Sequence, residues 1–263
     1  HKAHTIEDIE PQTSAAVPIS FDELVTFVEN TPGTYGIYVE NLVSEDTFEY
    51  NANTSFWAAS LFKIPVGATV YDLISQDKLS LNYVYTYESV DYQDGTGEIL
   101  NQPVGTNYTV EELVDLLFKS SDNVAQNILI RNVARTTVID YYDDLISPLE
   151  GQMFVDQSSS PYKIAHMLKK IYQKSSWSRD LRRDFLNRMV DTEFEEYIPS
   201  GLSDNLIFAH KIGIYPDLNQ HDCGIVFKEG FENPTVVCLM SESTEEDFKI
   251  VAEKLGEFIS TLY

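Results

Sequence analysis

The chain has 263 residues, which is enough for one large domain or two interleaved lobes around a sizeable core. Hydrophobic residues make up 43% of it, too many for a disordered chain, and 42 acidic against 18 basic residues give a formal net charge of -24. This balance excludes nucleic acid as a partner and disfavours an anionic membrane surface, because the cations needed to neutralise phosphates are missing. No apolar run approaches the roughly 18 residues of a membrane-spanning helix, so we expect no integral membrane segment.

The N-terminal part of the chain predicts a tether followed by a helix. Residues 1–19 show no periodicity, and we expect them to form a spacer. The chain begins with His1 rather than Met, so we expect either an excised piece or a processed precursor, from which any signal segment has been removed. Ser20 and Glu23 form a capping box before an apolar face, which predicts a helix from about residue 20 to a point before Pro32.

A hairpin and a buried helix are expected next. Residues 33–51 hold two alternating stretches around the polar turn 44–46, which predicts a β-hairpin. Residues 61–74 are apolar nearly all round and predict a buried helix. Pro65 is compatible with this helix only if the helix begins close to Ser60, so that the proline lies in or near its first turn.

The rest of the chain predicts more helices and then three strands. Capping residues open four of the helices, at Thr109 with Glu112, Ser160 before Pro161, Ser178, and Thr244 with Asp247. A further apolar stretch covers residues 124–133, and strands are expected within residues 206–215, 223–227 and 234–240.

The order of these elements indicates the fold class. It runs helix, hairpin, many helices, three strands and helix, without an internal repeat. We therefore predict an α/β (α+β) fold, in which an antiparallel sheet built from both chain ends is flanked by the terminal helices and carries an inserted all-helical lobe. A single domain would cover residues 20–263, with a sheet lobe of residues 20–57 and 201–263 and a helical lobe of residues 58–200.

Three short patterns combine residues suited to nucleophilic catalysis. They are Ser60-Leu61-Phe62-Lys63, Ser121-Asp122-Asn123 and Lys211-Ile212-Gly213. Each pattern is weak alone, because it recurs where helix ends, caps, turns or exposed helix faces explain it, at Ser75, Ser160, Ser203, Lys228 and Lys254.

The surroundings of the first set distinguish it from these copies. Lys63 lies at the start of a buried helix, where a lysine is costly unless it has a partner or a task. Positions i and i+3 share a helix face, so the nitrogen of Lys63 can reach the oxygen of Ser60. Ser121 falls in a polar step between two apolar stretches, and Lys211 lies in a strand that we expect to be central to the sheet.

In this order the three patterns resemble S-x-x-K, S-D-N and K-T-G, the signature of class A β-lactamases and penicillin-binding proteins. The resemblance covers the chain from about residue 20 to its end and includes the turn Gly95-Thr96-Gly97 and the segment HDCGIVF at residues 221–227. It implies a serine β-lactamase-like fold and a serine hydrolase that acts on β-lactams or cell-wall peptides. The site of action would be outside the cytoplasm, as a secreted, periplasmic or surface-tethered protein.

The resemblance also implies roles for the site residues. Ser60 would be the nucleophile of an acyl-enzyme. Lys63 would be its base, if burial and the charge of Lys211 lower the pKa of Lys63 from its ordinary value of about 10.4. Ser121 would relay a proton to the leaving nitrogen, and Asn123 would hydrogen-bond the substrate amide.

The third pattern would bind the substrate. By resemblance, Lys211 would attract the substrate carboxylate, with Gly213 beside it. The backbone N–H groups of Ser60 and Ile214 would form the oxyanion hole. The family's threonine is Ile212 here, so a hydroxyl that helps to hold the carboxylate is missing.

The segment that supplies the deacylating glutamate of class A enzymes also differs. The interval between Asn123 and the Ser160 helix is shorter than in that family and contains no E-x-x-L-N. Glu150 and Asp156 are the only carboxylates near that place, and neither has the matching surroundings. We therefore predict acylation of Ser60 without efficient hydrolysis of lactams.

Other functions remain compatible with the sequence. A D-Ala-D-Ala peptidase or a penicillin-binding protein would acylate and stay acylated, and a glutaminase-like amidase would share the fold. A non-catalytic cell-surface protein on the same scaffold is the alternative from another class, and the intact set of reactive side chains argues against it. We expect no cofactor or metal, since none of the five histidines has metal-ligand spacing.

Structural roles are expected for several other residues. His210 precedes Lys211 on a strand and should point to the opposite face. We assign Trp57 to packing rather than to substrate contact. Counting outward from the turn at residues 228–233 puts Cys223 almost opposite Cys238 on adjacent strands, and we favour two free thiols over a disulfide.

Overall fold

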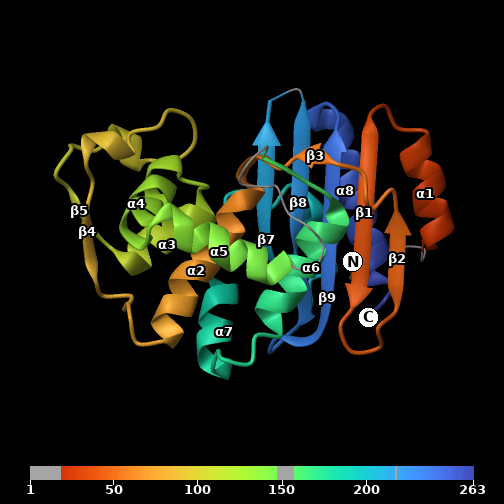
Figure 1. The fold of residues 1–263 in the computed structure, drawn as a ribbon. Coiled ribbons are helices and arrows are strands. Elements are labelled where there is room, and N and C mark those ends of the chain that lie inside the picture. The colour runs from red at the N-terminus through yellow and green to blue at the C-terminus, as the bar shows by residue number, and fades with distance from the viewer. Residues whose placement is uncertain (1–18, 147–156, 217) are drawn as a thin grey trace, which may run out of the picture.

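A five-stranded antiparallel sheet forms the centre of the protein (Figure 1). The computed structural model describes residues 19–146, 157–216 and 218–263. The strands lie in the order β2-β1-β9-β8-β7, with bounds β1 Thr34–Asn41, β2 Thr47–Tyr50, β7 Leu206–Tyr215, β8 Asn219–Lys228 and β9 Glu232–Glu242. The predicted hairpin from the N-terminal side therefore joins three strands from the C-terminal side in one sheet, through the pairing of β1 with β9, which confirms the expected α/β architecture.

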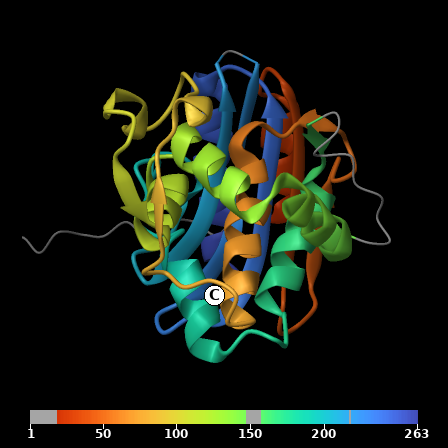
Figure 2. The ribbon, with the colours of Figure 1, turned by 60° about the vertical axis from the view of Figure 1, so that its left-hand side comes forward.

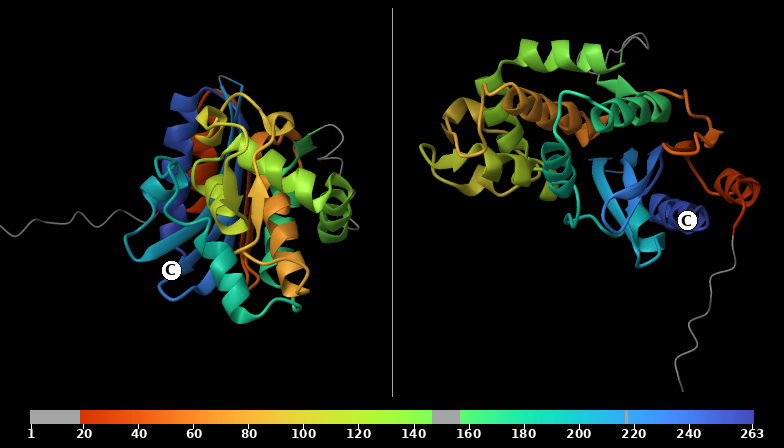
Figure 3. Two further views of the ribbon diagram at one scale, coloured as in Figure 1. Left: turned by 90° about the vertical axis from the view of Figure 1, so that its left-hand side faces the viewer. Right: turned by 90° about the horizontal axis from the view of Figure 1, so that it is seen from below.

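Helices cover both faces of this sheet. Helix α1 (Phe21–Glu29) and helix α8 (Glu245–Ser260) lie on one face, and α2 (Lys63–Ser75) and α6 (Pro161–Tyr172) lie on the other (Figure 3). Figure 2 shows α2 and α6 in front of the sheet. Each face has its own apolar core, and sheet residues with alternating directions contribute to both.

The remaining helices of the described residues all pack against α2. They are α3 (Val110–Lys119), α4 (Asn123–Val133), α5 (Arg135–Ile146) and α7 (Arg179–Asn187), and the 3₁₀ turn η1 (Ala59–Phe62) precedes α2. Two small ribbons pair β3 (Phe56–Trp57) with β6 (Ser158–Ser159) and β4 (Val84–Thr86) with β5 (Asn107–Thr109). The sequence did not predict these ribbons, because strands of two or three residues are too short to show a period.

Local signals at the helix ends are confirmed. The capping boxes of Ser20 with Glu23 and of Thr109 with Glu112 are both formed. Ser160 caps α6, with a proline at the start of that helix, and Thr244 caps α8. Side-chain oxygens at these positions accept bonds from backbone N–H groups that have no partner inside the helix.

The expectation that the strand with Lys211 is central to the sheet is wrong. Strand β7 pairs with β8 alone and forms one edge of the sheet. Its apolar sequence reflects burial of both faces and not a central position. Part of its outer edge is covered by another segment, because the backbone N–H of His210 donates to the carbonyl of Met189 at 2.8 Å.

The two cysteines correct a second expectation. Cys223 and Cys238 are direct partners across β8 and β9, which confirms the predicted register. They form a disulfide, with 4.0 Å between their Cα atoms, so the prediction of two free thiols is wrong. Direct neighbours in an antiparallel pair point to the same face, here a fully buried one, and this brings the two sulfur atoms within bonding distance.

Two wider properties of the described residues bear on function. No helix among them is both long enough and apolar enough to span a membrane. Within the same residues, no group of three or more His, Cys, Asp or Glu side chains is arranged to hold a metal ion.

Removing the disulfide should destabilise the fold. The double variant Cys223→Ala/Cys238→Ala lacks a cross-link between residues separated by 15 positions, and a closed loop of that length contributes roughly 3 kcal/mol. We expect urea denaturation to show a loss of about 2–3 kcal/mol in the free energy of unfolding. Alkylation of the unfolded, unreduced parent protein should find no free thiol, and two alkylated thiols would contradict the disulfide.

Candidate active site

Ser60 lies on a tight turn between β3 and α2. The turn is the 3₁₀ helix η1, and Ala59 within it has a φ of 47°, in the left-handed region. An L-residue in that region costs about 1–2 kcal/mol, so the residues around it must hold it there. The turn delivers Ser60 to the start of α2 and leaves Pro65 in the first turn of that helix, as the sequence predicts.

Lys63 is fully buried and surrounded by oxygen atoms. Its Nζ lies 3.1 Å from Ser60 Oγ and 3.1 Å from Ser121 Oγ. The same nitrogen lies 2.7 Å from the carbonyl oxygen of Ser121 and 2.7 Å from Asn123 Oδ1. Burial lowers the pKa of Lys63 to about 7, although the carboxylate of Asp122 acts in the opposite direction.

The contacts of Lys63 suit a neutral amine. Such an amine has two N–H donors and one lone pair. The carbonyl of Ser121 and the Oδ1 of Asn123 can only accept, so they take both donors. The lone pair is then left for the hydroxyl of Ser60 or of Ser121. A buried lysine in this state is a base placed beside a hydroxyl group.

Asp122 fixes the second pattern without touching the hydroxyl of Ser60. Its Oδ1 caps α4 by accepting from the N–H of Ala125 at 2.8 Å. Its Oδ2 accepts from the N–H groups of Glu98 and Ile99 at 2.8 and 3.0 Å. A Cβ at Gly97, whose φ is 110°, would lie 2.2 Å from the carboxyl carbon of Asp122. The glycine is therefore required for this close approach.

Thr96 supports the same residues from the opposite loop. Its Oγ1 donates to the carbonyl of Ser121 at 2.6 Å, and its own carbonyl accepts from the N–H of Asn123 at 3.0 Å. The sequence indicates the Gly95-Thr96-Gly97 turn but assigns a role to neither Thr96 nor Asp122. The two glycines that flank Thr96 were the available signal.

Lys211 approaches Ser121 from the sheet. Its Nζ donates to Ser121 Oγ at 2.9 Å and to the carbonyl of Ile212 at 3.0 Å, and it lies 5.7 Å from the centre of the Phe194 ring. Burial, and then the nearby charge of Lys63, lowers the pKa of Lys211 well below its ordinary value. Two ammonium groups around one buried hydroxyl repel each other, so each lysine disfavours the charged form of the other.

Gly213 and Ile214 bring the edge of the sheet against the Ser60 turn. A Cβ at Gly213 would lie 2.8 Å from the carbonyl oxygen of Ala58, so only glycine permits this contact. The N–H of His210 points away from β8, and backbone groups alternate along a strand. The N–H of Ile214 therefore points to the same open edge, beside η1. The edge position of β7, which the sequence did not predict, leaves this donor unpaired by β8.

The structure brings five of the predicted site residues together by hydrogen bonds. Ser60, Lys63, Ser121, Asn123 and Lys211 form one hydrogen-bonded group. Ile212 instead belongs to the apolar core on the opposite face of the sheet, under α8. Glu150 and Asp156 lie outside the described residues.

His210 lies on the opposite face from Lys211, as the sequence predicts, whereas Trp57 is 36% exposed. His210 is fully buried on the face of β7 opposite Lys211, where Nδ1 lies 2.7 Å from Asp222 Oδ1 and Nε2 lies 3.3 Å from Glu195 Oε1. Trp57 packs its ring against Tyr215, with 5.1 Å between ring centres, and its indole N–H donates to Gln157 Oε1 at 3.1 Å.

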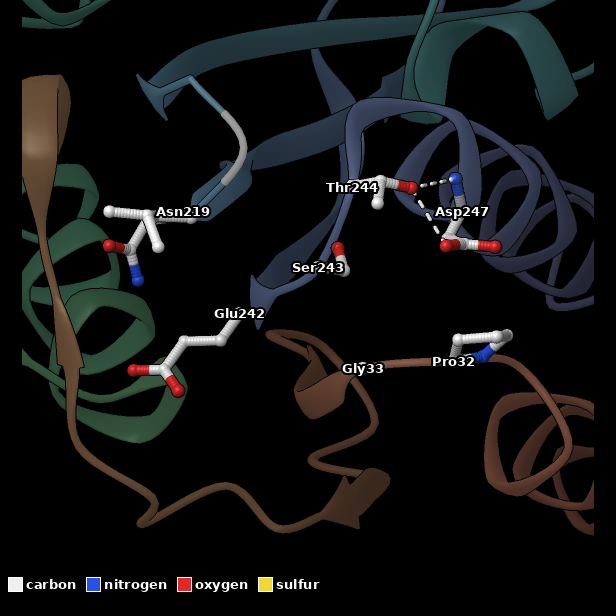
Figure 4. A pocket seen from close by; sticks show the side chains of 8 residues that line it. Pro32, Gly33, Asn219, Glu242, Ser243, Thr244 and Asp247 are labelled. Carbon is white, nitrogen blue, oxygen red and sulfur yellow. Dashed lines mark hydrogen bonds between the residues drawn. The ribbon is translucent and has the colours of Figure 1, made fainter.

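A groove elsewhere in the protein is separate from this group. It has a volume of about 550 Å³ and lies where the strands meet the start of α8 (Figure 4). Its lining residues are Pro32, Gly33, Leu218, Asn219, Glu242, Ser243, Thr244 and Asp247, none of which is a predicted site residue. Thr244 and Asp247 bond to each other there as the cap of α8, which explains their presence structurally.

The sequence is similar to proteins of one known family over most of its length. The family model described as "Beta-lactamase enzyme family" matches residues 20–261. A β-lactamase of Streptomyces albus G is 25% identical over 252 residues, which cover 84% of this chain and 80% of that protein. A β-lactamase of Amycolatopsis lactamdurans is 25% identical, over 80% of this chain and 73% of that protein.

Solved structures share the fold. A mutant of PBP-A, captured as an acyl-enzyme complex with penicillin G, superposes with a TM-score of 0.81 at 21% identity, over 92% of this chain and 95% of that one. A β-lactamase from Sphaerobacter thermophilus DSM 20745 superposes with a TM-score of 0.80 at 21% identity, over 92% of this chain and 97% of that one. At this identity the structural likeness supports the fold alone.

The buried histidines of β7 and β8 should carry different charges at neutral pH. Burial lowers the pKa of His210, but Asp222 and Glu195 outweigh it and raise that pKa to about 9. Burial lowers the pKa of His221 to about 4. We expect ¹⁵N NMR of the imidazole rings to show His210 protonated and His221 neutral between pH 5 and 8. A titration midpoint near 6.5 for either ring would contradict this.

Proposed function

The chain belongs to the beta-lactamase enzyme family, and from this premise we propose that it is a serine hydrolase in which Ser60 forms an acyl-enzyme with β-lactams or cell-wall peptides. The observation that carries the proposal is the contact of 3.1 Å between Ser60 Oγ and the Nζ of Lys63, a buried amine whose pKa is lowered to about 7. A base with a pKa near the working pH is suited to remove the proton of a hydroxyl nucleophile.

Acylation follows from these contacts. Neutral Lys63 takes the proton of Ser60 while Ser60 Oγ bonds to the acyl carbon. The carbon–nitrogen bond then breaks, and Lys63 returns the proton through the hydroxyl of Ser121 to the leaving nitrogen. Ser121 Oγ is 3.1 Å from Lys63 Nζ and 2.9 Å from Lys211 Nζ, so it lies between the two amines. Its hydroxyl can accept one proton as it donates another.

The negative charge that develops on the carbonyl oxygen is assigned to two backbone donors. We propose the N–H groups of Ser60 and Ile214, which the contact between Gly213 and Ala58 brings to the same edge of the sheet. A single donor of this kind typically contributes a factor of about 10²–10³ in rate. Lys211 would attract the substrate carboxylate, and that negative charge would in turn raise the pKa of Lys211 and favour its ammonium form.

The hydrogen bonds of Asn123 restrict its role more than the sequence implied. Its Oδ1 holds Lys63, and its Nδ2 donates to the carbonyl of Asp94 at 3.0 Å. Both ends of the amide are therefore occupied. We propose that Asn123 primarily orients the amine of Lys63, and that it binds the substrate amide only by exchanging the Asp94 carbonyl for it.

We propose that the acyl-enzyme is released slowly. Hydrolysis requires a base that directs water at the ester carbonyl. The family's motif for that base is absent from the sequence, and Ile212 provides no hydroxyl for the carboxylate. A D-Ala-D-Ala peptidase or penicillin-binding protein would share the acylation step, and differs from a β-lactamase in this second step. The complete group around Ser60 disfavours a non-catalytic protein.

The site of action is proposed to be outside the cytoplasm. The buried disulfide between Cys223 and Cys238 supports this, because disulfides persist in oxidising compartments and are rare in the cytosol. The substrate would be a small lactam or a peptide of the cell wall, without a cofactor or metal.

Intact-mass measurements over time, after mixing with benzylpenicillin, test acylation and release together. We expect an adduct of the whole penicillin to accumulate and decay slowly, with turnover below about one per second.

Ser60→Ala should abolish the adduct. Ser75→Ala and Ser160→Ala are matched controls that should leave it unchanged, since Ser75 Oγ bonds to Asp72 and Ser160 caps α6. Labelling of Ser60→Ala at the parent's rate would contradict the nucleophile. Faster turnover would make Glu150 and Asp156 the bases to mutate.

The rate of acylation should depend on pH through Lys63. The amine acts as a base only when neutral, so the rate should fall about tenfold per pH unit well below its pKa of about 7 and level off above it. Lys63→Ala should slow acylation by about 10²–10⁴ and remove this dependence. Both expectations are tested by the second-order rate constant for acylation by a fluorescent penicillin, measured between pH 5 and 8.5. A flat profile in the parent would exclude Lys63 as the base.

A further inference from the structure

We propose that His221 is a positioning residue for the nucleophile, because its side chain holds the backbone carbonyl of Trp57, three residues before Ser60. The inference rests on the proposed acylation of Ser60. His221 lies on β8, where its direct partners are Gly213 on β7 and Met240 on β9. It is fully buried, and both of its ring nitrogens bond to backbone groups rather than to the reactive side chains. Its effect must therefore pass through the turn.

The hydrogen bonds of His221 determine its tautomer. The backbone N–H of Ser241 lies 3.2 Å from Nδ1 and can only donate, so Nδ1 accepts. The proton of the neutral ring is then on Nε2, which donates to the carbonyl of Trp57 at 2.7 Å. Two backbone groups from different segments thus orient one ring. The ring links the centre of the sheet to the strand that leads into η1.

The turn that carries Ser60 is held at three points. His221 holds the carbonyl of Trp57, and the N–H of Ala58 donates to the carbonyl of Gln157 at 2.7 Å. The carbonyl of Ala58 lies against Gly213. The left-handed Ala59 follows directly, and such a conformation persists only when the surrounding structure holds it. Among the three holders, His221 is the one that acts through a side chain.

The same ring also contacts both segments that carry the proposed oxyanion donors. Its Cδ2 lies 3.1 Å from the position of a Cβ on Gly213, next to Ile214, while its Nε2 fixes the strand that precedes Ser60. The ring of Phe56 packs on it, with 6.1 Å between ring centres. His221 therefore sets the spacing between η1 and β7. A change in that spacing acts on charge that forms during the reaction, and acts little on binding of the unreacted ligand.

Saturation kinetics of acylation by benzylpenicillin separate these two effects. His221→Phe keeps a buried ring of similar size but lacks both hydrogen bonds. We expect it to lower the limiting rate of acylation at least tenfold, while the dissociation constant of the unreacted complex changes less than about threefold. His221→Gln retains a donor and an acceptor of sufficient reach, and should recover most of the rate. Unfolding in urea, followed for each variant, shows that it is folded during the assay.

A matched control separates positioning from stability. Val251 is fully buried in α8, on the opposite face of the sheet, so Val251→Ala weakens the core without touching the turn. It should acylate at the parent's rate. A rate for folded His221→Phe equal to that of the parent, or a matching loss in Val251→Ala, would overturn the positioning role.

Two further outcomes are decisive. If His221→Phe does not fold, His221→Asn replaces it, because its shorter amide does not reach the carbonyl of Trp57. The Asn variant should then be slow and the Gln variant fast, and equal rates for the two would overturn the inference.

If the parent itself is not labelled at Ser60, the proposed function fails and the positioning role fails with it. Labelling of the parent with undiminished rates in the His221 variants rejects the positioning role alone.

Discussion

The burial of one amine determines the rest of the site. Lys63 has no exposed surface, and an ammonium ion without water is costly unless oxygen atoms surround it. The carbonyl of Ser121 and the amide of Asn123 supply these oxygens, and both come from the start of a helix that Asp122 caps. Asp122 in turn requires Gly97 for its close approach. Burial lowers the pKa of Lys63, while the two acceptors and Asp122 keep the amine in place with its nitrogen beside Ser60.

The second constraint is the close contact between the edge of the sheet and the Ser60 turn. Gly213 removes the side chain that would block it, and the free edge of β7 directs the N–H of Ile214 toward η1. His221 reaches the same turn from β8. One half of the site thus comes from the helical layer, through Ser60, Lys63 and Ser121. The sheet supplies the other half, and reactivity depends on how the two layers pack together.

The charge at the site is opposite in sign to the net charge of the chain. The chain carries a net charge of -24, which opposes the approach of an anionic substrate, whereas Lys63 and Lys211 lie buried side by side. Salt screens the negative surface charge at distances beyond about 8–10 Å. A ligand close to the two lysines is therefore influenced mainly by their positive charge. In the proposed mechanism, a substrate carboxylate near Lys211 would stabilise its ammonium form, while Lys63 would act as the neutral base. The two amines can thus divide their roles when the substrate arrives.

The sequence by itself determined the features that depend on neighbours along the chain. Capping residues such as Ser20 and Thr109 set the helix starts, periodicity gave the strands, and the three motifs identified the group around Ser60. Counting from one turn even gave the register of Cys223 and Cys238. Tertiary structure alone decided that β7 lies at an edge and that the two sulfur atoms bond. It also decided that Asp122, Thr96 and His221 bond backbone groups next to the proposed reactive side chains. These features depend on contacts between residues far apart in sequence, and local patterns record whether a side chain is buried but not which distant atoms bury it.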